Sequence, residues 1–267
     1  MARGVRALVI ALLLSACTVP ADVGTETVTV TATEEVVVVV DVQPPATETV
    51  TVTSKPKSIS TPKSSSPPLR TSPALTALGK IPVKGRAPKM GYDRAMFGQT
   101  WSDDVTETYG HNGCDTRNDI LRRDLSAPMI KPGTNGCVAL SGSLHDPYTG
   151  QIIDFVRGQD TSRAVQVDHV VSLSNAWQTG AQQLTVEERQ NFANDPLNLL
   201  AVDGKANSQK GDGDAATWLP PRKAYRCEYA ARQIGVKKKH ALWVTPPERD
   251  ALQRILSACP GEQVPSR

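Results

Sequence analysis

The stretch "AVQVDHVVSLSNAW", residues 164–177, decides the fold because it sets two reactive side chains at the end of an expected strand. β-branched residues interleaved with polar ones lead up to Asp168 and His169, a pattern typical of a strand. A carboxylate beside an imidazole supplies a possible cation ligand and a group that titrates near neutral pH. The segments that would complete a site therefore have to be sought further along the chain.

Two such segments follow about thirty residues later. "PLNLLAVDG" at 196–204 predicts a second strand closed by the turn signal Asp203–Gly204, and it carries Asn198. "KANSQKGD" then predicts the start of a helix that carries Asn207. The insertion between His169 and Asn198 is long, so the two strands need not be joined by a simple hairpin.

These residue types suit the cleavage of a phosphodiester. His169 would take a proton from water, and the side-chain carbonyl of Asn198 would orient its ring. Asp168 and the amide oxygen of Asn207 would hold a hard divalent cation, for which Mg²⁺ is favoured and Mn²⁺ or Ca²⁺ are alternatives. With histidine as the base, activity is expected to fall below about pH 6.5.

The ordered set Asp-His, Asn, Asn-x-x-Lys-Gly-Asp resembles the HNH, or ββα-metal, nuclease motif, in the form that ends in asparagine. With "YDR" (92–94), "CDTRNDIL", "KAYRC" and "VTPPERDAL", residues 90–258 are similar to secreted bacterial HNH-family proteins. Those proteins share their domain with the C-terminal part of GmrSD-type restriction enzymes. The resemblance implies that Asp168 and Asn207 bind metal, His169 is the general base and Asn198 orients it. It also implies a phosphate contact for Lys210, and asparagine in place of the commoner histidine argues against Zn²⁺.

Arg94 and Arg117 are further candidates for contact with phosphate. Guanidinium groups bind phosphate oxygens through paired hydrogen bonds, although structural salt bridges are an equally good explanation. His111, His145 and His240 have no partner at a telling spacing, so we expect them on the surface. The four tryptophans, Trp101, Trp177, Trp218 and Trp243, are expected in the core.

The first part of the chain predicts export and a tether. Residues 1–17 have the layout of a secretory signal, and "LSAC" at 14–17 matches a lipobox in which Cys17 is lipidated. Residues 18–76 form a Thr/Val/Ser/Pro-rich segment that reads as a solvated tether. A single domain is expected over 77–260, with a short tail at 261–267.

Four cysteines remain after Cys17: Cys114, Cys137, Cys227 and Cys259. An even number in an exported domain predicts two disulfides, and three pairings are open. Loop closure and proximity favour Cys114–Cys137 and Cys227–Cys259. A zinc site is the weaker alternative, because no two cysteines have C-x₂₋₄-C spacing.

Local signals predict an α+β fold, with a ββα-metal core, additional helices and short strands, stapled by disulfides. Asp115 is placed to cap a helix within 114–125, and short strands are expected within 129–156. Capping boxes at Thr185/Glu188 and Thr245/Glu248 predict two more helix starts.

These observations predict an extracytoplasmic endonuclease, lipid-anchored to the outer face of the cell membrane or secreted. Its expected substrate is DNA, with RNA as an alternative, and its expected sequence preference is weak. A formal net charge of +3 says little about partners. The rival hypothesis is a non-catalytic, lipid-anchored surface protein that binds cell-wall polymer or a partner protein. The sequence indicates no oligomeric state.

Overall fold

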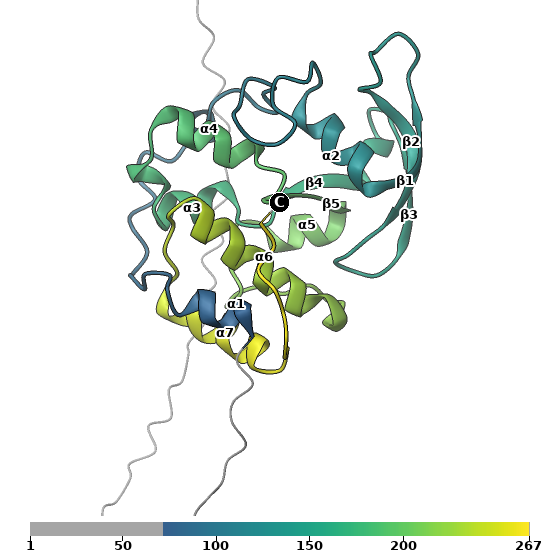
Figure 1. Ribbon diagram of the computed structural model, residues 1–267. Coiled ribbons are helices and arrows are strands. Elements are labelled where there is room, and N and C mark those ends of the chain that lie inside the picture. The colour runs from purple at the N-terminus through teal and green to yellow at the C-terminus, as the bar shows by residue number, and fades with distance from the viewer. Residues whose placement is uncertain (1–71, 267) are drawn as a thin grey trace, which may run out of the picture. The chain divides into compact units, whose positions relative to one another are not determined.

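The computed structural model describes residues 72–266 (Figure 1). The expected signal segment, the lipidation site Cys17 and nearly all of the expected tether lie outside the described residues. Within residues 72–266, no helix has the length and apolar character needed to cross a membrane.

The centre of the fold is a pair of strands followed by a helix. β4 (Val165–His169) pairs antiparallel with β5 (Leu199–Asp203), with His169 opposite Leu199. α5 (Gly204–Lys210) begins immediately after β5 and packs on both strands. The Asp203 side chain accepts a hydrogen bond from the backbone N–H of Ala206, so the predicted turn is a helix N-cap. The strand, strand, helix order is the one that the sequence predicts.

Helices fill the long connection between the two strands, so no simple hairpin joins them. α3 (Leu173–Gln178), the 3₁₀ turn η3 (Ala181–Gln183) and α4 (Val186–Asn194) lie between β4 and β5. α4 has the predicted capping box. The short 3₁₀ helix η1 (Arg94–Phe97) packs on α3 and α4, where Phe97 contacts Trp177 and Phe192.

A second sheet stands beyond helix α2 (Thr116–Asp124), which Asp115 caps as predicted. Its strands are β1 (Leu125–Ile130), β2 (Ala139–His145) and β3 (Ile152–Val156), paired antiparallel in that order, and η2 (Thr161–Arg163) leads from β3 to β4. Ile120 and Leu121 of α2 share one buried cluster with residues of both sheets. The predicted disulfide Cys114–Cys137 ties the start of α2 to the loop before β2.

The C-terminal part adds a helical layer. The turn η4 (Lys223–Tyr225) precedes α6 (Arg226–Lys239), and α7 (Pro246–Ser257) starts with the predicted capping box. The disulfide Cys227–Cys259, also predicted, joins α6 to the residues that follow α7. α1 (Pro73–Leu78) packs against both helices through Ala74 and Leu78. The packed region thus starts before residue 77, where the sequence placed the domain boundary.

Candidate active site

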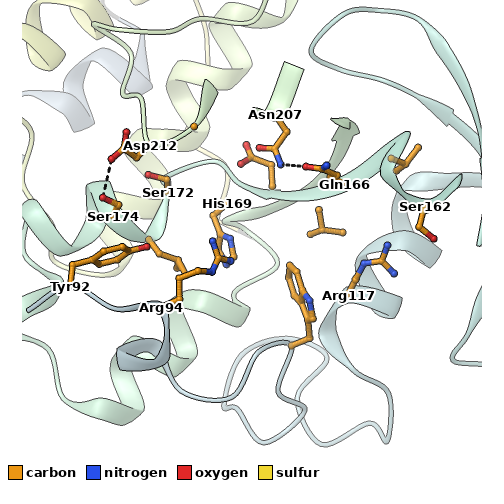
Figure 2. Close-up of a pocket in the computed structure, with 16 residues that line it drawn as sticks. Tyr92, Arg94, Arg117, Ser162, Gln166, His169, Ser172, Ser174, Asn207 and Asp212 are labelled. Carbon is orange, nitrogen blue, oxygen red and sulfur yellow. Dashed lines mark hydrogen bonds between the residues drawn. The ribbon is translucent and has the colours of Figure 1, made fainter. Parts of the chain in front are cut away.

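A cavity of about 460 Å³ runs along one edge of β4 (Figure 2). Among the described strands β4 pairs only with β5, so its other edge is free to border this cavity. All five residues of β4 line it. The remaining wall includes residues from η1, α2 and α5, among them the predicted Arg94, Arg117 and Asn207.

Strand geometry explains why Asp168 and His169 are neighbours in the sequence. Successive side chains of a strand point to opposite faces. Gln166 and Asp168 therefore turn toward α5, where they bond Asn207 and Lys210. His169 turns the other way, toward α4. Because Asp168 and His169 both lie at the unpaired edge of β4, their carboxylate and imidazole border the same cavity from opposite faces of the strand.

The ring of His169 is fixed by a helix end. Its Nε2 lies 2.8 Å from the carbonyl oxygen of Ala193, in the last turn of α4. Carbonyl groups in the last turn of a helix have no hydrogen-bond partner within that helix, and a carbonyl oxygen can only accept a hydrogen bond. Nε2 therefore carries the proton, and Nδ1 keeps its lone pair.

The surroundings of His169 keep its ring neutral. His169 is 9% exposed, and the Trp101 indole stacks on its ring, with 5.8 Å between the ring centroids and 14° between the ring planes. Trp101 has a left-handed φ of 58°, uncommon for a bulky residue, so the backbone bears strain at this position. Burial lowers the pKa of His169 to about 4, and the charges of Arg94 and Lys210 act in the same direction. The sequence-based expectation of an activity loss below pH 6.5 needs correction, because the neutral ring persists to lower pH.

Asn198 does not contact the His169 ring, contrary to the sequence-based prediction. Its Oδ1 accepts from the backbone N–H of Val171 at 2.8 Å, and its Nδ2 donates to the carbonyl of Val171 at 3.2 Å. The Asn198 carbonyl also accepts from the backbone N–H of Val170. Asn198 thus holds the segment that leaves β4, while a backbone carbonyl orients the ring.

Asp168 is held from two directions. The Tyr148 hydroxyl donates to its Oδ2 at 2.5 Å, and the Lys210 ammonium donates to its Oδ1 at 3.0 Å. Burial raises the pKa of Asp168, although the charge of Lys210 opposes the shift. An additional positive charge beside this carboxylate would favour its ionised form.

Lys210 is not placed to bind phosphate, which corrects the prediction for this residue. It is 3% exposed, and its ammonium also donates to the His169 carbonyl at 2.8 Å. Lys210 therefore braces both residues of the Asp168–His169 pair from inside the fold.

Asn207 presents an oxygen to the cavity. Its Nδ2 donates to Gln166 Oε1 at 2.8 Å, so the amide oxygen faces the opposite way (Figure 2). The carboxylate of Asp168 and this amide oxygen are ligands that a hard cation accepts, with water and substrate filling the other positions. The residues present therefore fit Mg²⁺ better than Zn²⁺, provided that the cation shares Asp168 with Lys210.

Arg94 and Arg117 line the cavity without partners of their own. Neither guanidinium has a hydrogen bond or ion pair with any residue in the range 72–266. The structural salt bridges that the sequence left open for them are thus not found in the described part. Two positive groups in one cavity without acceptors provide a place for an anion.

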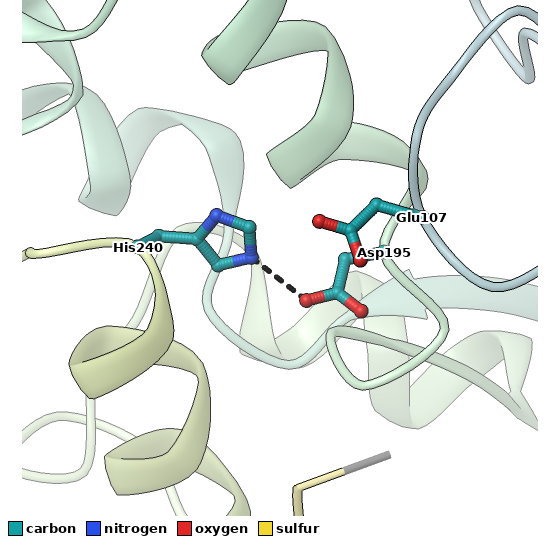
Figure 3. A group of neighbouring side chains, drawn as sticks. All are labelled: Glu107, Asp195 and His240. Carbon is teal, nitrogen blue, oxygen red and sulfur yellow. Dashed lines mark hydrogen bonds and ion pairs between the residues drawn. The ribbon is translucent and has the colours of Figure 1, made fainter.

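A second group of metal-ligand residue types lies elsewhere (Figure 3). Glu107, Asp195 and His240 place one ligand atom each within 4.8 Å of one another. His240 Nε2 lies 2.7 Å from Asp195 Oδ2, and the Lys239 ammonium pairs with both carboxylates. His240 is half-buried and bonded, so the expectation that it is an ordinary surface residue is wrong.

Several residues of the cavity escaped the sequence analysis. Tyr148 lies in a turn with no pattern that links it to Asp168, and the Ala193 carbonyl has no side-chain signal at all. Trp101 was assigned to the core but lines the cavity. Gln166 had a usable signal, because it lies two residues before Asp168 and must share its face of the strand.

Comparison with known proteins places the chain in a family. Residues 115–255 match the family described as "GmrSD restriction endonucleases, C-terminal domain", and the chain belongs to this family. Arg94 and Trp101 precede the matched region. The bacterial source suggested by the sequence receives no support, because the matching curated relative is fungal.

That relative is an uncharacterized secreted protein of Arthroderma benhamiae. It is 38% identical over 176 residues, which cover 65% of this chain and 78% of the relative. No solved structure matches the chain.

Proposed function

We propose that this chain is a metal-dependent endonuclease that hydrolyses phosphodiester bonds of DNA, with RNA as the alternative substrate. The family description supports a nuclease. The observation that carries the proposal is the pairing of a neutral histidine with an unpartnered arginine, Arg94, in one cavity. A hydrolase acting on an anionic ester needs both features.

The hydrolytic step uses His169 as the base. Its Nδ1 takes a proton from water as the water oxygen bonds to phosphorus, the P–O bond to the leaving strand breaks, and the leaving oxygen takes up a proton from solvent. The Ala193 carbonyl stabilises the imidazolium that forms, because it accepts from Nε2. Arg94 lies beside the ring and binds the non-bridging oxygens of the phosphate (Figure 2).

Asp168 and Asn207 would hold a divalent cation, with Mg²⁺ the best fit to their oxygens. Bound there, the cation supplies positive charge to the phosphate and to the leaving oxygen. Tyr148 and Lys210 keep the carboxylate in place for it.

Recognition through phosphate predicts little sequence preference. Contacts to phosphate oxygens carry no direct information about the bases, and they weaken as salt rises. We expect cleavage of unrelated DNA sequences at similar rates and a steep fall in affinity between low and high salt.

We further propose an extracytoplasmic location, with lipidation at Cys17 as one route to the membrane and secretion as the other. The relative's description as secreted and the two disulfides support export. The rival hypothesis of a non-catalytic surface protein is less well supported, because it assigns no role to the free His169 nitrogen or to the two arginines.

The decisive experiment measures nicking of supercoiled plasmid by the full chain in Mg²⁺, with EDTA as a parallel condition. His169→Ala should lower the rate by about 10²–10⁴-fold, the usual contribution of a general base. His145→Ala is the matched control, since it removes an exposed imidazole from β2. Equal nicking by wild type and His169→Ala, or nicking that EDTA leaves intact, would overturn the proposed mechanism.

A further inference from the structure

One end of the cavity holds a positive charge that the proposed chemistry does not use. Arg117 projects from the first turn of α2, is half-buried, and has no acceptor among residues 72–266. The guanidinium nitrogens of Arg117 remain accessible to solvent in the cavity wall, so an anion that enters the cavity can bind them.

A second guanidinium stands behind Arg117. Arg157 follows β3, and its Nε donates to the carbonyl of Ala139 at 2.7 Å and its Nη2 to the amide oxygen of Asn118 at 2.5 Å. Both acceptors are neutral, so they fix Arg157 without cancelling its charge. Burial and the charge of Arg157 lower the pKa of Arg117, which reports the same excess of positive charge.

Asp115, the acid whose charge acts on Arg117, is already engaged. Asp115 caps α2, accepting from the backbone N–H of Asn118 at 2.9 Å and from its side-chain amide at 2.5 Å. Asp115 therefore moderates the field at Arg117 without forming an ion pair with it. An anion entering the cavity would meet an open guanidinium.

The two arginines of the cavity occupy different places. In Figure 2, Arg94 and Arg117 lie on opposite sides of His169, with Ser162 and Gln166 toward Arg117. The charge of Arg94 acts on the His169 ring, whereas the charges acting on Arg117 are those of Arg157 and Asp115. One arginine thus belongs to the reacting phosphate, and the other to a position further along the cavity.

We propose that Arg117, with Arg157 behind it, forms a second phosphate subsite that binds a backbone phosphate next to the scissile one. A nucleic-acid strand carries a phosphate at every link, so a strand lying along β4 would offer one phosphate to Arg94 and another to Arg117. The subsite deepens the proposed function and rests on it. It makes the substrate a polynucleotide strand and disfavours a simple, single-phosphate diester.

The test compares a polymer with a substrate that has one phosphate. Full-length wild type and Arg117→Ala are assayed on a fluorescent oligonucleotide and on bis(p-nitrophenyl) phosphate, both in Mg²⁺. Arg117→Ala should lower kcat/KM for the oligonucleotide by about 10-fold or more, the scale of one good charged contact. Its kcat/KM for the small diester should stay within about twofold. In a plot of log kcat/KM for the oligonucleotide against log salt concentration, the slope for Arg117→Ala should be shallower than that for wild type by about one.

Arg163→Ala is the matched control. Arg163 lies in η2, is 76% exposed, and pairs with Asp160. Arg163→Ala should leave kcat/KM unchanged for both substrates. Arg117→Lys keeps the positive charge but loses the paired N–H donors of the guanidinium. Its kcat/KM for the oligonucleotide should therefore lie between those of wild type and Arg117→Ala. Thermal unfolding of each variant identifies any loss that comes from the fold.

A binding measurement separates the subsite from the proposed activity. Fluorescence anisotropy of the same oligonucleotide in EDTA should show a Kd for Arg117→Ala about 10-fold weaker than for wild type. Unchanged binding, or an equal loss on both substrates by a folded variant, would overturn the subsite. If wild type hydrolyses neither substrate, the nuclease proposal fails, and anisotropy alone then decides whether the subsite exists.

Discussion

Two clusters in this protein use the same residue types and differ in what they leave free. The Asp168–His169–Asn207 cavity and the Glu107–Asp195–His240 cluster each bring an imidazole and carboxylate oxygens together. In the second cluster the protein satisfies its own charges, since Lys239 pairs with both carboxylates and His240 bonds Asp195. Around His169, a nitrogen lone pair, an amide oxygen and two guanidinium groups stay open. The presence of metal-ligand residue types is therefore a weaker indication of a binding site than the presence of polar and charged groups that have no partner within the protein.

The largest expected effect separates the two clusters by activity. Asp168→Ala should lower plasmid nicking by about a thousandfold, because the charge stabilisation from a bound cation amounts to several kcal/mol. Glu107→Ala removes a carboxylate from the closed cluster and should leave nicking within about threefold. Comparable losses in the two variants would show that the two clusters do not differ in function.

The next effect concerns the buried pair behind the cavity. Lys210→Met leaves Asp168 without its ammonium partner, and breaking a buried pair costs about 3–5 kcal/mol of unfolding free energy. Urea unfolding measures the change. Lys205→Met, on the exposed side of the same helix, is the control and should shift the unfolding free energy by less than about 0.5 kcal/mol. A Lys210→Met protein as stable as this control would show that the pair contributes little.

A smaller effect is expected at the closed cluster. Hydrogen bonds from His240, the Leu197 N–H and Lys239 outweigh burial and hold the pKa of Asp195 below its usual value. Ionised Asp195 therefore stabilises the fold above about pH 4, and this stabilisation is lost as pH falls through the lowered pKa that Asp195 has in the folded protein. Asp195→Asn should cost about 1–3 kcal/mol at pH 7, and the difference from wild type should shrink as pH falls below 4. Urea unfolding at several pH values checks this, and a pH-independent difference would contradict it.

The smallest effect is spectroscopic. NMR titration of the metal-free protein should give His169 a ring midpoint near pH 4, because burial disfavours the imidazolium. The acid limb of kcat/KM should lie correspondingly below pH 6.5, since the base is lost only on protonation. A His169 midpoint near 6.5 would mean that the ring is better hydrated than its 9% exposure suggests.

Signals confined to a few residues were sufficient to predict much of the fold. The caps at Asp115, Thr185 and Thr245, the two disulfides, and the order of β4, β5 and α5 were all read from spacing. These features depend on neighbours within a turn or on pairing rules, so the sequence contains them directly. The helix at 73–78 was missed because its short apolar run is indistinguishable from a tether until α6 and α7 cover it.

The contacts inside the site were harder to predict, because they join distant segments. The prediction gathered Asp168, His169, Asn207, Arg94 and Arg117, and all five line one cavity. It failed for Asn198 and Lys210, whose partners depend on how β4 leaves the sheet and how α5 packs. Neither the Ala193 carbonyl nor the Tyr148 hydroxyl could be assigned a partner before the packing of α4 and the turn at 146–151 was known.

The disulfide Cys114–Cys137 closes three residues before Arg117, at the start of the helix that carries this side chain into the cavity. Thiols stay reduced in the cytosol, so a newly made chain there would have one wall of its cavity held by packing alone. If the chain is exported as proposed, the helix that carries Arg117 would be covalently braced only after the chain has left the cytosol. Covalent closure would then couple the completion of this cavity wall to export.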